Sequence, residues 1–401
     1  MDKTIILNMK IKNKRKKEKE KIDIYQKINS ILVVAFFSMR LIDILWLHEY
    51  TVILLYFGFF IAVFAFLNVS IHQSVRLKKD DFLLFGTAWI GLFIGILYNN
   101  NLEWTELIWC IKYFCIAYVL LQGELWEKPV IITYMGFVLF FFLSFYKGQS
   151  IFTLAESVSR NAIGMNLLLL VSIYYISITR KEGHRFSFMV PLSFLLITFW
   201  TGSRSSIITA FILLFGEIFS RKKEQSRKIF LKLAIILMLF VLSVMWLNKS
   251  GRLDSYLGAF ALKSNLVLIQ DTRFELIAVY FDSCVKKMGN LFWGADLNSI
   301  PRIAYFSGNP HNMFIRLHAN FGLVFFLLIT IKSIKTSVYL LKNNQMLFFV
   351  FIAMLARGFA DIVGFTGLFD PIIYFFLLIE SHTFLRISKT DRKNTNKEKI
   401  K

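Results

Sequence analysis

The sequence predicts an all-α polytopic membrane protein with about twelve transmembrane helices and one large extracytoplasmic loop. Of the 401 residues, 56% are hydrophobic and only 18% are charged, which is less charge than a soluble protein of this length carries. Apolar runs of roughly 17–20 residues, the length that crosses a bilayer core, recur from end to end. We therefore expect no soluble domain of any size.

The net charge of +21 is concentrated in a few places. Lysine and arginine gather at the two termini ("MKIKNKRKKEKEK" and "RKNTNKEKIK") and in short loops, as is typical of cytoplasmic charge beside anionic lipid. This placement argues against a nucleic-acid partner. The three cysteines have neither a disulfide framework nor a zinc spacing, so we expect no metal site.

The apolar runs define the predicted helices in order. Nine precede the large loop, at 28–47, 51–71, 82–98, 104–121, 129–146, 162–178, 186–200, 205–219 and 229–247, and three follow it, at 312–331, 346–363 and 368–385. The first and eleventh helices carry charges at spacings that allow local pairing, namely Arg40 with Asp43 and Arg357 with Asp361. Lys112, in the fourth helix, can snorkel or line a cavity.

The connecting segments predict the orientation. Those on the side of the N-terminus, including 72–81, 179–185, 220–228 and 332–345, hold most of the lysine and arginine, which predicts that both termini are cytoplasmic. The chain then divides into a basic N-terminal segment, helices one to nine, a large extracytoplasmic loop, helices ten to twelve, and a basic tail, at 1–27, 28–247, 248–311, 312–385 and 386–401.

The segment "TRFELIAVYFDSCVKKMGN" predicts a helix within the loop. Thr272 and Glu275 have the spacing of a capping box, and Gly289 can end the helix. An apolar stripe is formed by Phe274, Ile277, Phe281, Cys284 and Met288. We expect this helix to lie on the membrane surface or against the bundle.

Several cationic side chains stand at predicted helix N-termini on the external side. In "GNPHNMFIRLHANFG", Asn309 suits the N-cap and Pro310 the first helical position, so His311 would be the second residue of its helix. The others are Arg160 with Asn161, Arg204 after a cap by Thr201 or Ser203, and Arg273. Helix N-termini and arginine both bind phosphate, so their convergence would form a site for a lipid-linked diphosphate. The helix dipole would also lower the pKa of His311 and favour the neutral imidazole.

These stretches resemble motifs of one family. His311-Asn312, nine residues and Gly322 resemble the histidine motif in the large external loop of the O-antigen ligase and polysaccharide polymerase family, with a departure at Phe325, where Gly, Thr or Tyr is expected. "TGSRSSIITAFILLF" is similar to the family's Ser-Arg turn, and "SRNAIGMNLLLL" to an Asn-containing helix start. "TRFELIAVYFDSCVKKMGNLFWGAD" is similar to the segment with an arginine, here Arg273, and a later glycine, here Gly294. The resemblance covers roughly residues 155–330.

The resemblance implies a C-type glycosyltransferase membrane fold and a metal-independent reaction without a cofactor. Members of the family transfer glycan from an undecaprenyl diphosphate carrier to an acceptor hydroxyl. Carried over, Arg204 and Arg273 would bind the diphosphate leaving group, and His311 would act as general base or position the acceptor. The loop acids are alternative bases, namely Asp254, Asp271 and Asp296.

The remaining site residues are expected to bind substrate, namely Arg160, Asn161, Ser203, Asn312, Arg316 and His318. For His318, two turns beyond His311, a packing or hydrogen-bonded role is the expectation. The first function hypothesis is a polymerase of undecaprenyl-diphosphate-linked oligosaccharide repeat units for capsule or exopolysaccharide, in the cytoplasmic membrane of a bacterium. A ligase that moves finished glycan to a lipid or protein, and a flippase, are the alternatives. The expected partners are the lipid bilayer, a flippase and a chain-length regulator.

Overall fold

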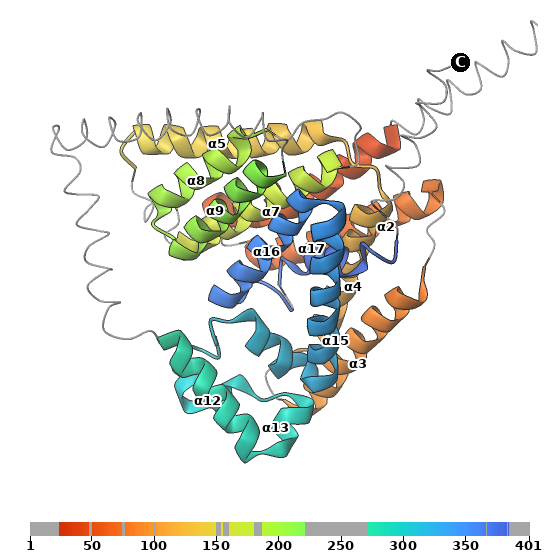
Figure 1. Cartoon of the computed structure of the whole chain (residues 1–401), viewed down its shortest axis with the longest axis vertical. Coiled ribbons are helices and arrows are strands. Elements are labelled where there is room, and N and C mark those ends of the chain that lie inside the picture. Colours follow the sequence, from red (N-terminus) through yellow and green to blue (C-terminus); the bar gives the residue numbers. More distant parts are fainter. Residues whose placement is uncertain are drawn as a thin grey trace, which may run out of the picture. The chain divides into compact units, whose positions relative to one another are not determined.

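The computed structural model describes residues 24–47, 50–73, 77–99, 102–149, 154, 160–179, 187–220, 272–365, 367–382 and 384. All regular structure in these residues is helical (Figure 1). Seven of their helices are long and apolar enough to cross a membrane: Ile24–Leu47, α2 (Thr51–Gln73), α3 (Lys79–Tyr98), α4 (Thr105–Gln122), α5 (Glu127–Tyr146), α7 (Arg160–Thr179) and α15 (Met313–Asn343). The prediction of a helical membrane protein is therefore confirmed. The predicted helix 229–247 and residues 248–271 of the predicted loop lie outside the described residues.

Shorter helices stand where several spans were expected. They are α8 (Met189–Thr201), α9 (Arg204–Phe219), α16 (Gln345–Ala360) and α17 (Asp370–Leu378). The predicted helices 346–363 and 368–385 are longer than α16 and α17. The helix α16 ends at Ala360 because Asp361 is extended, with φ −160° and ψ 166°.

The described residues form two compact units, with a boundary inside α3. Unit 1 comprises residues 1–89, 104–185 and 366–401, and unit 2 comprises 90–103 and 186–365. In unit 1, α2 and α17 pack on α4, and α5 packs on α7. The rings of Phe114 and Tyr374 stack at 4.3 Å, which joins α4 to α17.

Three charged residues predicted within apolar helices lie in unit 1. Arg40 pairs with Asp43, as predicted, and Asp43 also accepts a hydrogen bond from the Thr51 hydroxyl at 2.8 Å. Lys112 is buried, with Nζ 3.9 Å from the centroid of the Trp109 ring. Its charge is therefore held by a cation–π contact inside the unit, and the lysine does not snorkel.

In unit 2, α9 packs against both α8 and α16, and α16 packs against α15. Gly216 allows the close approach of α9 and α16, because a Cβ atom at this position would lie 2.6 Å from Cβ of Phe349. The N-terminus of α9 and the C-terminus of α16 therefore belong to the same layer of unit 2.

The helix α15 differs from the predicted span 312–331. It continues to Asn343, so most of the segment 332–345, expected as a cytoplasmic loop, is helical. Residues 332–343 contain no glycine or proline that would stop a helix, and the long stems of their lysines can lie along an apolar surface. The expectation of a loop there was wrong, because the positive charge was taken as the end of the helix.

A break divides α15 at Gly322, whose backbone has φ 75° and ψ 179°. A break of this kind leaves carbonyl groups of the preceding turn without helical partners. The side-chain amide of Asn99 donates to the carbonyl of Ala319 at 3.1 Å. Gly95 lies against the next carbonyl, because a Cβ atom there would lie 2.3 Å from the oxygen of Asn320. The end of α3 therefore packs directly on the broken turn.

The loop residues that follow Thr272 fold into a helical layer. It consists of α12 (Thr272–Lys286), α13 (Met288–Trp293), the 3₁₀ helix η3 (Leu297–Ser299) and α14 (Pro301–Ala304). Two glycines join this layer to α15 by backbone contact. A Cβ atom on Gly294 would lie 2.1 Å from the Ala319 oxygen, and one on Gly322 would lie 2.6 Å from the Phe292 oxygen. Gly294 and Gly322, which belong to two of the sequence motifs, thus allow the loop layer and α15 to cross with their backbones in contact.

The predicted details of the loop helix need correction. Its end is Lys286, and Gly289 lies inside α13. The buried face is made by Leu276, Tyr280 and Cys284, whereas Phe274, Phe281 and Met288 of the predicted stripe are exposed. The buried face packs on Ile315 and Ala319 of α15 and on Ala295, Leu297, Ile300 and Ile303. The helix lies against the helical bundle of its unit, and it shows a second apolar face outward.

Candidate functional site

The turn before α9 has the form that the sequence predicts. Gly202, in the left-handed region with φ 63°, ends α8, and Arg204 begins α9 with its side chain exposed. Ser203 occupies the N-cap position, but its side chain makes no capping bond. Its hydroxyl lies 2.8 Å from that of Ser206 and is buried. Ser203 therefore holds the turn together, and Arg204 remains accessible.

The turn is tied to α16 by a buried arginine. Arg357 has a fully buried side chain, and it donates to the hydroxyl of Ser205, the neighbour of Arg204. Its other terminal nitrogen lies 3.4 Å from Oδ2 of Asp361, which confirms the predicted local pair. Arg357 thus connects the N-terminus of α9, through Ser205, to the C-terminus of α16, through Asp361.

His311 lies at the same place but not in the predicted conformation. Its φ is +48°, in the left-handed region, and its backbone N–H donates to the side chain of Asn309 at 2.8 Å. The N-cap is Asn312, whose side-chain oxygen accepts from the N–H groups of Phe314 and Ile315. The prediction that Asn309 and Pro310 start the helix was wrong, because Asn309 closes the preceding turn instead.

Because His311 lies before the helix, its pKa has a different main cause from the one expected. Burial lowers its pKa from 6.5, the charge of Asp361 raises it, and the charge of Arg273 lowers it. The Nδ1 atom of His311 lies 4.0 Å from Oδ1 of Asp361, and both side chains are partly exposed, at 35% and 21%. The expected direction of the shift holds, but its first cause is burial and not the helix dipole.

Arg273 lies in the first turn of α12, as predicted, and its side chain is exposed. The neighbouring acid Glu275 accepts from Arg302 at 2.9 Å, so its charge is balanced within the layer. Four helix ends, from α9, α12, α15 and α16, therefore bring together a group that we call the Arg–His–Asp cluster. It consists of Arg273, His311, Arg357 and Asp361, with Arg204 next to Ser205 at its edge.

Asp361 is the residue that sequence reasoning missed as part of the site. Its spacing from Arg357 was interpreted as a structural pair, and the structure adds His311 as a further neighbour. The signal was present, because an ionisable residue inside an apolar segment is a functional candidate by default. Among the loop acids proposed as bases, Asp296 caps η3 by accepting from Asn298 and Ser299. Asp254 and Asp271 lie outside the described residues.

His318 has the hydrogen-bonded role that was expected. It is buried, its Nδ1 lies 2.7 Å from the Tyr280 hydroxyl, and its Nε2 lies 2.8 Å from the carbonyl oxygen of Leu291. A carbonyl oxygen only accepts, so Nε2 carries the proton and Nδ1 accepts from Tyr280. The histidine joins α12 and α13 to α15.

The other predicted substrate contacts differ in their surroundings. Asn312 is buried, caps α15 and donates to the carbonyl of Phe359 at 3.3 Å, so its side chain is used by the fold. Arg316 is partly exposed on the next turn of α15. Arg160 and Asn161 begin α7, in unit 1, and their role in the site stays a prediction.

Comparison with known proteins names no activity. No family model matches the chain, and no solved structure matches it. A protein of Methanocaldococcus jannaschii, described only as uncharacterised, is 26% identical over 144 residues, which are 36% of this chain. The chain spans about half the length of that relative, 51%.

Proposed function

We propose that the protein is a metal-independent glycosyltransferase that joins undecaprenyl-diphosphate-linked oligosaccharide units into capsular polysaccharide or exopolysaccharide. The observation that supports this most is the Arg–His–Asp cluster. It combines the exposed guanidinium of Arg273, a histidine with lowered pKa and a carboxylate that is held by Arg357. The reaction needs these groups, since it must bind a diphosphate, remove a proton from a hydroxyl and stabilise the charge that develops.

The histidine is suited to the proton transfer. Its lowered pKa keeps the imidazole neutral near neutral pH, so it can accept the proton of the acceptor hydroxyl. Asp361, at 4.0 Å from Nδ1, would stabilise the imidazolium that forms, and Arg357 holds Asp361 from the other side. With Nδ1 facing the carboxylate, Nε2 of His311 is the atom that would take the proton.

The arginines are suited to the leaving group. Arg273 and Arg204 are exposed at helix N-termini, and an exposed guanidinium can bind two phosphate oxygens at once. In the proposed reaction the acceptor oxygen forms a bond to the anomeric carbon. The bond from that carbon to the phosphate oxygen breaks, and its electron pair leaves with the diphosphate. The proton passes to His311 and later to solvent.

The proposed location is the outer face of a bacterial cytoplasmic membrane, with both termini cytoplasmic, as the distribution of lysine and arginine suggests. The acceptor would be the end of the next lipid-linked unit. A ligase would use the same chemistry with a different acceptor, and a flippase would need no proton transfer. The proposed protein partners are a flippase and a chain-length regulator.

Deletion of the gene with labelling of the glycan separates these functions. Loss of a polymerase leaves single repeat units outside the cell and no long chains. A ligase mutant would keep full-length chains on the carrier, and a flippase mutant would hold units on the cytoplasmic face. Either of the last two outcomes contradicts the proposal.

Substitution tests the site directly. We expect His311→Ala, Arg204→Ala and Arg273→Ala each to abolish polymer while the protein still reaches the membrane. The matched control is Lys286→Ala, which removes an exposed cation from the other end of α12, where it pairs with Asp282 at 2.6 Å. Wild-type chain length in the His311 and Arg204 variants would contradict the assignment.

A further inference from the structure

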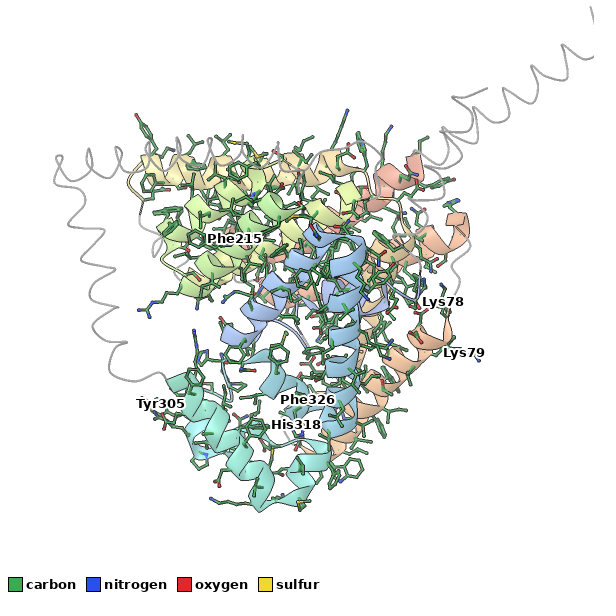
Figure 2. The ribbon with its side chains drawn as sticks, viewed as in Figure 1. Lys78, Lys79, Phe215, Tyr305, His318 and Phe326 are labelled. Atoms are coloured by element: carbon green, nitrogen blue, oxygen red, sulfur yellow. The ribbon has the colours of Figure 1, made fainter. Side chains whose placement is uncertain are left out.

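A cavity of about 290 Å³ lies in unit 2 between the loop helices and α15. Ile277 and Phe281 line it from α12, Leu291 from α13, and Ile315 and Phe326 from α15. Figure 2 shows His318 and Phe326 in the region between α12 and α15. The lining is almost wholly apolar, so the cavity suits an apolar ligand.

The polar groups in its wall are already paired. The Tyr280 hydroxyl donates to His318, and His318 donates to the carbonyl of Leu291. A ligand therefore gains little by offering hydrogen-bonding groups there, and a hydrocarbon chain loses nothing. This excludes sugar as the favoured occupant of the cavity.

One end of the cavity adjoins the Arg–His–Asp cluster. Ile277 stands one turn after Arg273 on α12, and the lining residue Asn312 follows His311 directly. Phe359, also in the lining, is bonded through its carbonyl to the Asn312 side chain at 3.3 Å. From this end the cavity continues along α15 past its break, to Leu323 and Phe326. A molecule with an anionic head and an apolar chain would fit both parts.

We propose that this cavity, which we call the chain groove, binds the part of the polyprenyl chain next to the diphosphate. This inference rests on the proposed function, because it takes the head group to lie at the cluster. The volume fits roughly ten carbon atoms, if each occupies the ~30 Å³ that a water takes in the liquid. The groove thus selects the two isoprene units nearest the head group, and the rest of the chain lies in the membrane.

The first test measures the dependence of binding on chain length. The purified full-length protein in amphipol is titrated with methyl, ten-carbon and fifteen-carbon prenyl diphosphates. A buried methylene is worth roughly fourfold in affinity, so we expect at least a tenfold gain from methyl to ten carbons. The gain from ten to fifteen carbons should be less than threefold, since the groove is then filled. Equal affinity for the methyl and ten-carbon ligands would overturn the inference.

The second test fills the groove. Ile277→Trp and Ile315→Trp should each weaken binding of the ten-carbon diphosphate at least tenfold and leave the methyl diphosphate unchanged. The matched control is Val324→Trp, which introduces the same side chain on the exposed face of α15. Retained methyl diphosphate binding shows that a variant is folded. A ten-carbon ligand that binds both groove variants as tightly as the wild type would overturn the inference.

The outcomes also separate the groove from the proposed function. If binding is lost in Arg273→Ala, but does not depend on chain length and is unchanged in the two groove variants, the groove alone is overturned. If the wild-type protein binds no prenyl diphosphate, the proposed function and the groove fail together. Chain-length dependence that persists in Arg273→Ala would support the groove while placing the head group elsewhere.

Discussion

The two Arg–Asp pairs predicted within apolar helices, one in each unit, have different third partners. In unit 1, Asp43 pairs with Arg40 and accepts from the Thr51 hydroxyl at 2.8 Å, and only 4% of its side chain is exposed. In unit 2, Asp361 pairs with Arg357 and lies 4.0 Å from His311, with 21% of its side chain exposed. The first carboxylate is enclosed, and the second faces a residue that can exchange a proton.

Helical spacing alone does not distinguish an enclosed pair from one that faces a titratable neighbour. Spacings of three and four residues both allow the arginine to neutralise the carboxylate. The difference lies in burial. In unit 2 the arginine, Arg357, is fully buried and its partner Asp361 is partly exposed. In unit 1 the order is reversed, because Arg40 is 35% exposed and Asp43 is enclosed. The group that reaches the surface is the carboxylate of Asp361 in one pair and the guanidinium of Arg40 in the other.

The largest expected difference is in activity. Asp361→Asn removes the charge beside His311 and should lower the rate of polymer formation about 10²–10⁴-fold, the range of general-base assistance. Asp43→Asn is the matched control, and activity per folded molecule should stay within about twofold of wild type. Both are measured by polymer length and by the amount of protein in the membrane. Equal loss in the two variants would show that both pairs are structural.

The next difference is in stability. Arg357→Met leaves Asp361 without its cation, and removal of one partner from a buried pair costs about 3–5 kcal/mol. We expect a value at the lower end, since Asp361 is partly exposed. Arg40→Met leaves Asp43 without its cation in the same way, and because only 4% of the Asp43 side chain is exposed, the loss should lie at the upper end of this range. Thermal unfolding in detergent measures both, and a smaller loss in the Arg40 variant would contradict the role of burial.

A smaller effect concerns the protonation of His311. Because its pKa is lowered, the neutral base persists below pH 6.5, and activity should fall only as the pH drops through this lowered pKa. Asp361 raises this pKa and Arg273 lowers it. The midpoint should therefore move to lower pH in Asp361→Asn and to higher pH in Arg273→Ala.

The midpoint can be measured without activity. Diethyl pyrocarbonate modifies the neutral imidazole, so its rate of reaction with His311 reports the titration. The protein has six histidines, and the signal of His311 is obtained by difference from His311→Gln. Shifts of the same sign in the two variants would show that the charges do not act as described.

The class of fold followed from the sequence, but several boundaries did not. Apolar length identified the seven helices that are long enough to span a membrane in the described part of the chain, because the bilayer sets that length. It did not locate the break at Gly322 or the extension of α15 to Asn343, since a hydropathy average reports apolar length and not the backbone conformation of a single residue. The contact of Gly294 and Gly322 with opposing backbone depends on packing between segments far apart in the sequence.

For the candidate site, the sequence indicated which residues to consider but not their geometry. Arg204, Arg273 and His311 were found because each is a polar residue at the edge of an apolar run. The conformation of His311 was missed, because Asn309 and Asn312 are equally good caps by sequence and only the fold selects one. Asp361 was missed as a member of the site because its third partner lies 50 residues away.

The smallest expected effect concerns the third partner of the enclosed pair. Thr51→Val removes the hydroxyl that donates to Asp43 and keeps the side-chain shape. Asp43 retains Arg40, so the loss should be that of one hydrogen bond to a charged group, about 1.5–3 kcal/mol at most, and smaller if water replaces it. Activity per folded molecule should not change, because Arg40 and Asp43 do not belong to the Arg–His–Asp cluster. A fall in activity with unchanged thermal stability would mean that the enclosed pair also serves the reaction.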